Sequence, residues 1–455
     1  MTSTDATAAP VRAVPAPSVE GRRDRRAESP SGRIAFAVVV AGWIGILGML
    51  LALPLFVSHD SVSNYAHVWF LAKSLWHGHG VPFHIPLAGG AAYTFPYGFF
   101  PWMFSALLWP LFGEWSVTLA LVLGSVGLGF AMFAAFPELG RGWWAAAALV
   151  NPCLVVAVIN AQLPFVWAMA FAFVAIMYWR RGRPALAALF AAMAQLTHVV
   201  VLFPILLVLV LVRAFWEPEP KRLLKWYALS TVVVVPAAAL VLASPVYEAT
   251  AAATKAFNLA DTILPRAVLL LVPLVVLGLQ HLRGRLRRDN AWLPVAGFVV
   301  ALLCNAVFAP AFDTEYAWAG LRRVPDRNVS AFTKSKAFVP GRTYRVLRRY
   351  DGKVGMYEYL KAGAKLDSEF FPEGFAHRSF RSLTVYSKFL RKRRVDVVVV
   401  YRSYDDARHD EHQLLDDLAA RRRRGCSEDT VGVRVLDRGS DFTAYAIDRA
   451  CGGSS

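Results

Sequence analysis

The segment SHDSVSNYAHVWFLAKSLW, residues 58–76, directly follows an apolar run, residues 34–57. The run is long enough to cross a bilayer, because a membrane-spanning helix needs roughly 20 predominantly apolar residues. After it, apolar and aromatic side chains recur at helical spacing, which predicts an amphipathic helix over 61–76. Its apolar stripe comprises Tyr65, Val68, Trp69, Ala72, Leu75 and Trp76, whereas Asn64, His67, Lys73 and Ser74 fall elsewhere. Such a helix lies in the interface plane of a membrane, so we expect a span that leads into an interfacial helix.

The composition confines the chain to one class. Hydrophobic residues make up 56% of the 455 residues and the mean hydropathy is +0.42, which indicates a polytopic membrane protein. The net charge of +17 does not predict nucleic-acid binding, because many arginines sit in clusters that flank apolar segments. Retention on the cytoplasmic side and contact with anionic lipid explain those clusters.

The apolar segments predict about 9–10 membrane segments within residues 34–310. They cover 34–57, 99–112, 115–136, 143–160, 163–179, 184–197, 199–215, 226–244, 263–280 and 291–309. Residues 1–33 read as a disordered cytoplasmic tail, and residues 58–98 as an external loop with the interfacial helix. The basic cluster 283–288 places the chain after Pro310 outside, so we expect one segment between 99 and 197 not to cross.

Residues 311–455 are polar and charged, and they predict an extracytoplasmic α/β domain. Strands are expected at 343–347, 396–401, 432–436 and 443–447, and helices at 383–393 and 411–420. The continuous apolar run at 396–401 suits a strand that is buried on both faces.

Four stretches together resemble the GT-C-type glycosyltransferases, integral membrane enzymes that take sugars from polyprenyl-phosphate carriers. They are HDSVSNY at 59–65, FPYGFFP at 95–101, the pair NP and NAQLP between 151 and 164, and the basic turn RRGR at 180–183. Their order resembles that of the mannosyltransferase-like branch over roughly residues 34–310. The resemblance implies a polytopic GT-C-like fold, an external active-site loop that begins with an acidic residue, and a C-terminal external domain.

Asp60 is the predicted catalytic base. Sugar transfer to a hydroxyl needs a group that accepts the proton of the acceptor, and a carboxylate in a partly dry cleft can do this. A carboxylate at the end of a span is also costly against lipid, which favours a functional role. The competing interpretation is an N-cap for the helix that begins near Ser61.

The predicted substrate-binding residues are His59, Tyr65, Tyr97, His198, Lys255 and Arg266. His198 stands between two apolar half-segments, where an ionisable group indicates a site, although a satisfied core histidine remains the alternative. Lys255 and Arg266 could bind a phosphate, but cations are common in loops beside a membrane. Five histidines share the loop 58–98, yet no ligand spacing accompanies them, so no metal and no cofactor are expected.

Three further features complete the expectations. Cys426 and Cys451 flank the last two strands, and an antiparallel hairpin would bring them close enough for a disulfide in an oxidising setting. Glu138 is a second acidic candidate. The acidic stretch 367–373 reads as a solvated loop.

The resulting hypothesis is a multi-pass cell-membrane glycosyltransferase with a cytoplasmic N-terminus. It would use a polyprenyl-phosphate-linked sugar as co-substrate and an envelope glycan, lipid or protein as acceptor. The alternative is a transporter or flippase for a lipid-linked or anionic substrate, which could use the same broken helices. A non-catalytic scaffold that presents the external domain is a third possibility.

Overall fold

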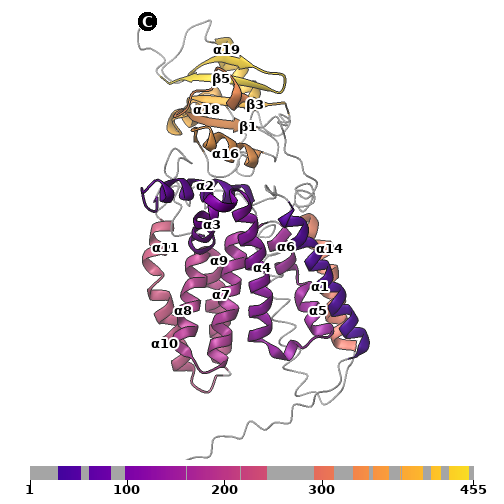
Figure 1. Cartoon of the computed structure of the whole chain (residues 1–455). Coiled ribbons are helices and arrows are strands. Elements are labelled where there is room, and N and C mark those ends of the chain that lie inside the picture. Colours follow the sequence, from indigo (N-terminus) through magenta and orange to yellow (C-terminus); the bar gives the residue numbers. More distant parts are fainter. Residues whose placement is uncertain are drawn as a thin grey trace, which may run out of the picture.

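The computed structural model shows a helical bundle, a single helix across one end of the bundle, and a small α/β domain beyond that helix (Figure 1). It describes residues 29–52, 61–82, 98–159, 161–215, 217–242, 292–311, 331–347, 352–367, 380, 382–402, 411–421 and 430–449. Asp60 and the predicted segment 263–280 lie outside these residues, as do Cys426 and Cys451.

Most predicted apolar segments correspond to helices of nearly the same length. The bundle contains α1 (Pro30–Leu51), α3 (Phe99–Phe112), α4 (Trp115–Ala135), α7 (Leu163–Arg180), α8 (Pro184–Thr197), α9 (Val199–Ala214) and α14 (Trp292–Ala311). Prolines stand in the first turns of α1, α7 and α8, where their missing N–H is not needed.

Two predicted apolar segments each correspond to two helices. Residues 143–160 are divided at Asn151 into α5 (Trp143–Leu149) and α6 (Pro152–Ile159). Residues 226–244 instead form α10 (Pro220–Val232) and α11 (Val235–Leu242). In both cases the second helix carries a proline at its start, and proline removes a helical hydrogen bond and disfavours the helical conformation in the residue before it.

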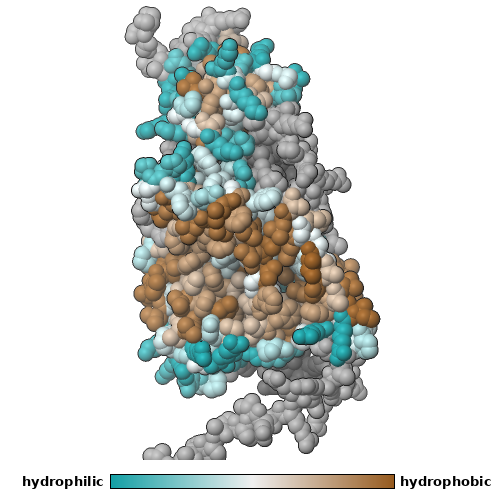
Figure 2. Space-filling model, viewed as in Figure 1, coloured by the Kyte–Doolittle hydropathy of each residue, from teal (hydrophilic) through white to brown (hydrophobic). Residues whose placement is uncertain are grey.

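The surface of the bundle has the polarity of a membrane protein. Among the described residues, α1, α4 and α7 are long and apolar enough, by length and composition, to cross a membrane. On the face that Figure 2 shows, an apolar band crosses the bundle, with hydrophilic residues at both ends of the bundle and over the α/β domain.

The domain is built on a five-stranded sheet with the order β2-β1-β3-β5-β4. Its strands are β1 (Thr343–Leu347), β2 (Lys365–Leu366), β3 (Val397–Tyr401), β4 (Gly432–Arg438) and β5 (Phe442–Asp448). β1 pairs in parallel with β2 and β3, whereas β5 is antiparallel to β3 and β4. The four predicted strands and the final antiparallel hairpin are confirmed, and β2 is an additional short strand.

Helices cover both faces of this sheet. α16 (Gly352–Lys361) lies on the face toward the bundle, and α18 (Leu383–Lys392) and α19 (Glu411–Arg421) cover the other face (Figure 1). Val397 and Val399 belong to the apolar core on the α16 face of the sheet. Val398 and Val400 belong to the apolar core on the face that α18 and α19 cover. The alternation follows the pleat, so the prediction that this strand is buried on both faces is confirmed.

A buried ion-pair network lies inside the domain. Arg345 of β1 donates to Glu411 and to Asp367, and all three side chains are at most 4% exposed. The sequence context predicted a solvated loop at Asp367, and this prediction is wrong for that residue, because its side chain is buried against Arg345. Burial is the largest cause that raises the pKa of Asp367, and the negative charge of Glu411 raises it further; the attraction of Arg345 lowers it but does not outweigh them.

Candidate functional site

The helix across the end of the bundle is α2 (Ser61–Trp76), and its predicted bounds are confirmed. It is buried on more than the predicted apolar stripe, since every side chain from Asn64 to Val68 is at most 2% exposed. Tyr65 and Val68 contact the core of the bundle, whereas Ala66 contacts the core of the α/β domain. The expectation of an exposed polar side is wrong for this half, because Asn64 and His67 are buried against Trp102 of α3. The α/β domain lies on the other side of α2 from the bundle (Figure 1).

Asn64 ties α2 to two other parts of the bundle. Its Nδ2 donates to Ala161 O at 2.9 Å, and its Oδ1 accepts from Trp102 Nε1 at 2.9 Å. His67 stacks on the Trp102 ring with 4.2 Å between centroids. A buried amide group is costly unless it is hydrogen-bonded, so the Asn64 side chain favours the one placement of α2 in which both bonds form. The orientation of the first turns of α2 therefore depends on polar contacts as well as on apolar burial.

Tyr65 is enclosed between the bundle and the domain. Its hydroxyl lies 3.0 Å from Thr118 Oγ1 of α4, and its ring is 6.0 Å from the ring of Tyr357 of α16. A cavity of about 10 Å³, close to the space that one water needs, lies beside Asn64, Tyr65 and Thr118. In the described structure Tyr65 thus fixes α2 in place rather than facing an open cleft.

A helix break lies where the sequence predicted it, at His198. α8 ends at Thr197, α9 begins at Val199, and the His198 ring makes an edge contact with Phe165 at 5.9 Å. Gly98 N donates to Thr197 O at 3.1 Å, which ties the start of α3 to this break. Gly98 has a φ of +68°, and a Cβ there would lie 2.7 Å from Trp102, so only glycine fits.

The other predicted site residues lie outside the described residues. They are His59, Asp60, Tyr97, Lys255 and Arg266. By chain connectivity Asp60 directly precedes α2, and Tyr97 directly precedes Gly98. The described structure therefore brings together the two elements that follow Asp60 and Tyr97, because Trp102 of α3 bonds to Asn64 of α2.

Sequence reasoning missed a polar contact between the domain and the bundle. Tyr357 Oη donates to Glu114 Oε1 at 2.8 Å, and Lys361 Nζ lies 3.3 Å from the same oxygen. Burial opposes ionisation of Glu114, but the hydrogen bond from Tyr357 and the charge of Lys361 outweigh it and lower its pKa. No local pattern could reveal this contact, since 243 residues separate Glu114 from Tyr357.

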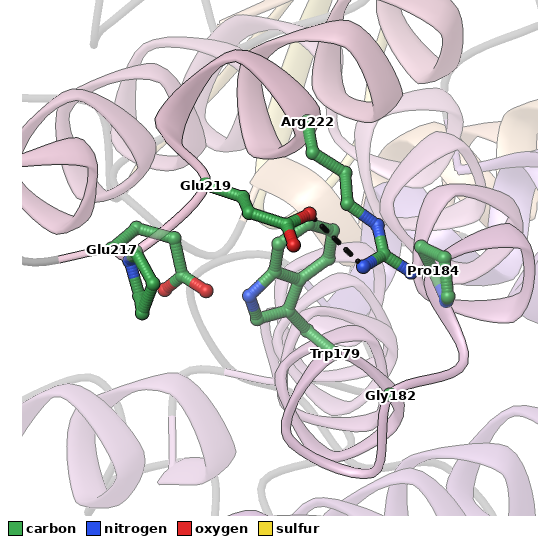
Figure 3. A pocket seen from close by; sticks show the side chains of 7 residues that line it. Trp179, Gly182, Pro184, Glu217, Glu219 and Arg222 are labelled. Carbon is green, nitrogen blue, oxygen red and sulfur yellow. Dashed lines mark hydrogen bonds and ion pairs between the residues drawn. The ribbon is translucent and has the colours of Figure 1, made fainter. Parts of the chain in front are cut away.

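The opposite end of the bundle carries a cleft of about 200 Å³ (Figure 3). Glu217 and Glu219 flank Trp179 there, but each carboxylate already pairs with an arginine, Arg213 or Arg222. Glu138 is paired with Arg180 and is exposed. The carboxylates of this end are thus neutralised by solvent-exposed partners, and we do not assign the site to it.

Comparisons with known proteins give a distant structural likeness. No family model and no curated protein sequence matches the chain. The chain is similar to the crystal structure of ArnT from Cupriavidus metallidurans in the apo state, with 14% identity, a TM-score of 0.41, and coverage of 92% of this chain and 100% of that one. For ArnT bound to undecaprenyl phosphate the identity is 15%, the TM-score 0.39, and the coverage 91% and 99%.

The fold and the site define a helical protein with apolar spans whose cross-lying helix α2 is enclosed by a small α/β domain. Among the described residues, no group of three or more His, Cys, Asp or Glu side chains is placed to hold a metal ion.

Proposed function

We propose that this chain is a polytopic membrane glycosyltransferase that transfers a sugar from a polyprenyl-phosphate carrier to an acceptor hydroxyl of the cell envelope. The observation that carries the proposal is α2, an interfacial helix with buried polar groups, placed between the apolar bundle and a water-exposed domain. A substrate with a lipid tail and a polar head needs contact with both environments, and such a helix lies where the two meet. The resemblance of the 59–65 and 95–101 stretches to GT-C enzymes points to the same reaction.

In the proposed reaction, the bond between the sugar's anomeric carbon and the carrier phosphate breaks while the acceptor oxygen bonds to that carbon. Asp60 takes the proton of the acceptor hydroxyl, and the carrier leaves as polyprenyl phosphate. His59, Lys255 and Arg266 are proposed to contact the phosphate, and His198 contributes from the helix break. Tyr97 belongs to the aromatic segment that is proposed to hold the sugar and the acceptor.

The proposed orientation places the N-terminus in the cytoplasm and the α/β domain outside. The start of α1, the end of α7 and the start of α10 lie at the end of the bundle opposite the domain (Figure 1). Arg180 is the last residue of α7, and Arg222 stands in the first turn of α10. Basic residues that flank spans favour the cytoplasmic side, which supports the orientation. A reporter fused to the C-terminus tests it, because labelling of that reporter in the cytoplasm would contradict it.

The central experiment compares Asp60→Asn with Asp60→Ala in a strain that lacks the gene. Asparagine caps a helix as well as aspartate does but cannot accept the proton. We expect Asp60→Asn to lower transfer by roughly 100-fold or more at normal protein level, the usual scale for a general base. Full complementation by Asp60→Asn would remove Asp60 from the mechanism.

Analysis of the lipid-linked sugars and envelope glycans of the same deletion strain distinguishes the transferase from the transporter or flippase hypothesis. Loss of one sugar residue from an envelope glycan, together with the sugar-loaded carrier on the outer leaflet, supports the transferase. Accumulation of an intact loaded carrier on the inner leaflet would instead support a flippase.

A further inference from the structure

Helix α16 of the domain has two faces that serve different cores. Tyr357 is 1% exposed and belongs to the apolar core of the bundle, whereas Tyr359 and Leu360 belong to the core beside the sheet. Residues two apart on a helix point about 200° apart, so one short helix reaches both bodies. Tyr357 is the residue of the described domain that enters the bundle core.

The hydroxyl of Tyr357 donates a hydrogen bond to a carboxylate of the bundle. Glu114 Oε1 accepts from Tyr357 Oη at 2.8 Å and lies 3.3 Å from Lys361 Nζ. Lys361 also lies over the Tyr357 ring, with 4.9 Å from Nζ to the centroid. A hydrogen bond to an ionised carboxylate is stronger than one between neutral groups, and here it is half-shielded from water. The contact therefore sets where α16 sits, beyond simple apolar burial.

The same residues reach α2 through a closed set of contacts. Tyr357 contacts the ring of Tyr65, and the hydroxyl of Tyr65 pairs with Thr118. Thr118 stands four residues after Glu114, one helical turn away at the start of α4. Each of α2, α4 and α16 is thus fastened to the other two within one helical turn of α4.

We propose that Tyr357, together with Glu114 and Lys361, positions the first half of α2 for the transfer reaction, so that the α/β domain is part of the catalytic unit. The inference rests on the proposed function, because α2 directly follows Asp60 in the chain. These three are positioning residues that act through α2. A misplacement of about 1 Å in such a support can cost up to about 100-fold in rate.

The first measurement needs no substrate. Hydrogen exchange of the full chain in nanodiscs reports the opening of α2 (Ser61–Trp76). We expect Tyr357→Phe, which keeps the ring and removes the hydroxyl, to speed exchange in the first half of α2 about 10-fold. Tyr359→Phe is the matched control, because its hydroxyl contacts Tyr401 inside the domain at 3.2 Å. It should leave exchange in α2 unchanged, and unchanged exchange in Tyr357→Phe would overturn the proposal.

The second measurement is sugar transfer in membranes of the deletion strain that carry each variant. We expect Tyr357→Phe and Glu114→Leu to lower the maximal rate about 10-fold with less than a 2-fold change in the apparent KM for the loaded carrier. Glu114→Gln should retain most activity, because its side-chain carbonyl still accepts from Tyr357. The Tyr357→Phe/Glu114→Leu double variant should be no slower than Glu114→Leu alone, because that substitution already removes the hydrogen bond that Tyr357→Phe removes.

The outcomes separate this proposal from the proposed function. Faster exchange in α2 with a normal transfer rate would overturn positioning while leaving the transferase in place. Absence of transfer by the wild-type chain would overturn the proposed function, and this inference with it, whatever the exchange shows. Faster exchange together with a lower rate, rescued in Glu114→Gln, supports both.

Discussion

The two ends of the bundle use polar residues in opposite ways. On the side of the α/β domain, Asn64 is buried and bonds to Trp102 and to a backbone carbonyl. Inside the domain itself, Arg345, Asp367 and Glu411 are buried and pair with one another. At the other end, the pairs Arg180–Glu138 and Arg222–Glu219 have side chains that are 41% to 65% exposed. Water competes at the exposed end and is excluded at the buried one, so similar groups differ several-fold in energetic consequence. The difference indicates that polar contacts fix the packing on the domain side of the molecule and contribute little to it at the other end.

The largest effect should come from breaking the buried network. Arg345→Met leaves Asp367 and Glu411 facing one another without a cation, which we expect to cost about 3–5 kcal/mol of domain stability. Hydrogen exchange of β1 and β3 in the full chain measures this loss. Arg449→Met, which removes the partly exposed pair with Asp396, is the control and should cost about 1 kcal/mol or less. Equal losses in both variants would contradict the comparison.

A smaller loss is expected at Asn64. Asn64→Ala leaves Trp102 Nε1 and Ala161 O without the partner that Asn64 provides, at a cost of about 1–3 kcal/mol. Thermal unfolding in nanodiscs, followed by tryptophan fluorescence, measures the change in stability. Ser74→Ala on the same helix removes an exposed bond to Gly80 and should be nearly silent. A silent Asn64→Ala would show that this polar contact does not hold α2.

The pH dependence of the domain sharpens the same contrast. Because burial raises the pKa of Asp367, the folded state binds this proton more tightly than the unfolded state does. The stability from that proton is full below the ordinary aspartate pKa of about 3.9 and is lost as pH rises through the raised value. Asp367→Asn removes this term, so exchange-derived stability should fall less with rising pH than in wild type. If wild-type stability instead rose relative to Asp367→Asn as pH increased through this range, the pKa of Asp367 would be lowered in the folded state, and the inference of a raised pKa would be wrong.

The smallest effect belongs to the exposed end. Glu138→Gln removes the ionic part of the contact with Arg180, which we expect to change stability by less than about 1 kcal/mol. Sugar transfer should remain at the wild-type rate. A strong loss of transfer in a normally folded Glu138→Gln variant would move the candidate site to this end.

Local pattern was sufficient for many elements. The bounds of α2, α3 and α8 and the four longer strands follow from apolar periodicity and from the turn residues between them. The helix break at His198 was also predictable, because two short apolar segments meet at a polar residue. The breaks at Asn151 and before Val235 were missed, although Pro152 and Pro236 stood in the sequence to signal them.

What the sequence by itself determined about this protein is therefore its class: an apolar, many-helix chain with an interfacial helix and a separate α/β domain. Those features depend on side chains a few residues apart, whose spacing is visible in the chain. Only the tertiary structure decided that Asn64 and His67 are buried, that Asp367 pairs with Arg345, and that Tyr357 reaches Glu114. Each of these contacts joins residues that are far apart in the sequence. Local spacing therefore cannot reveal them, because they depend on which surfaces the fold brings together.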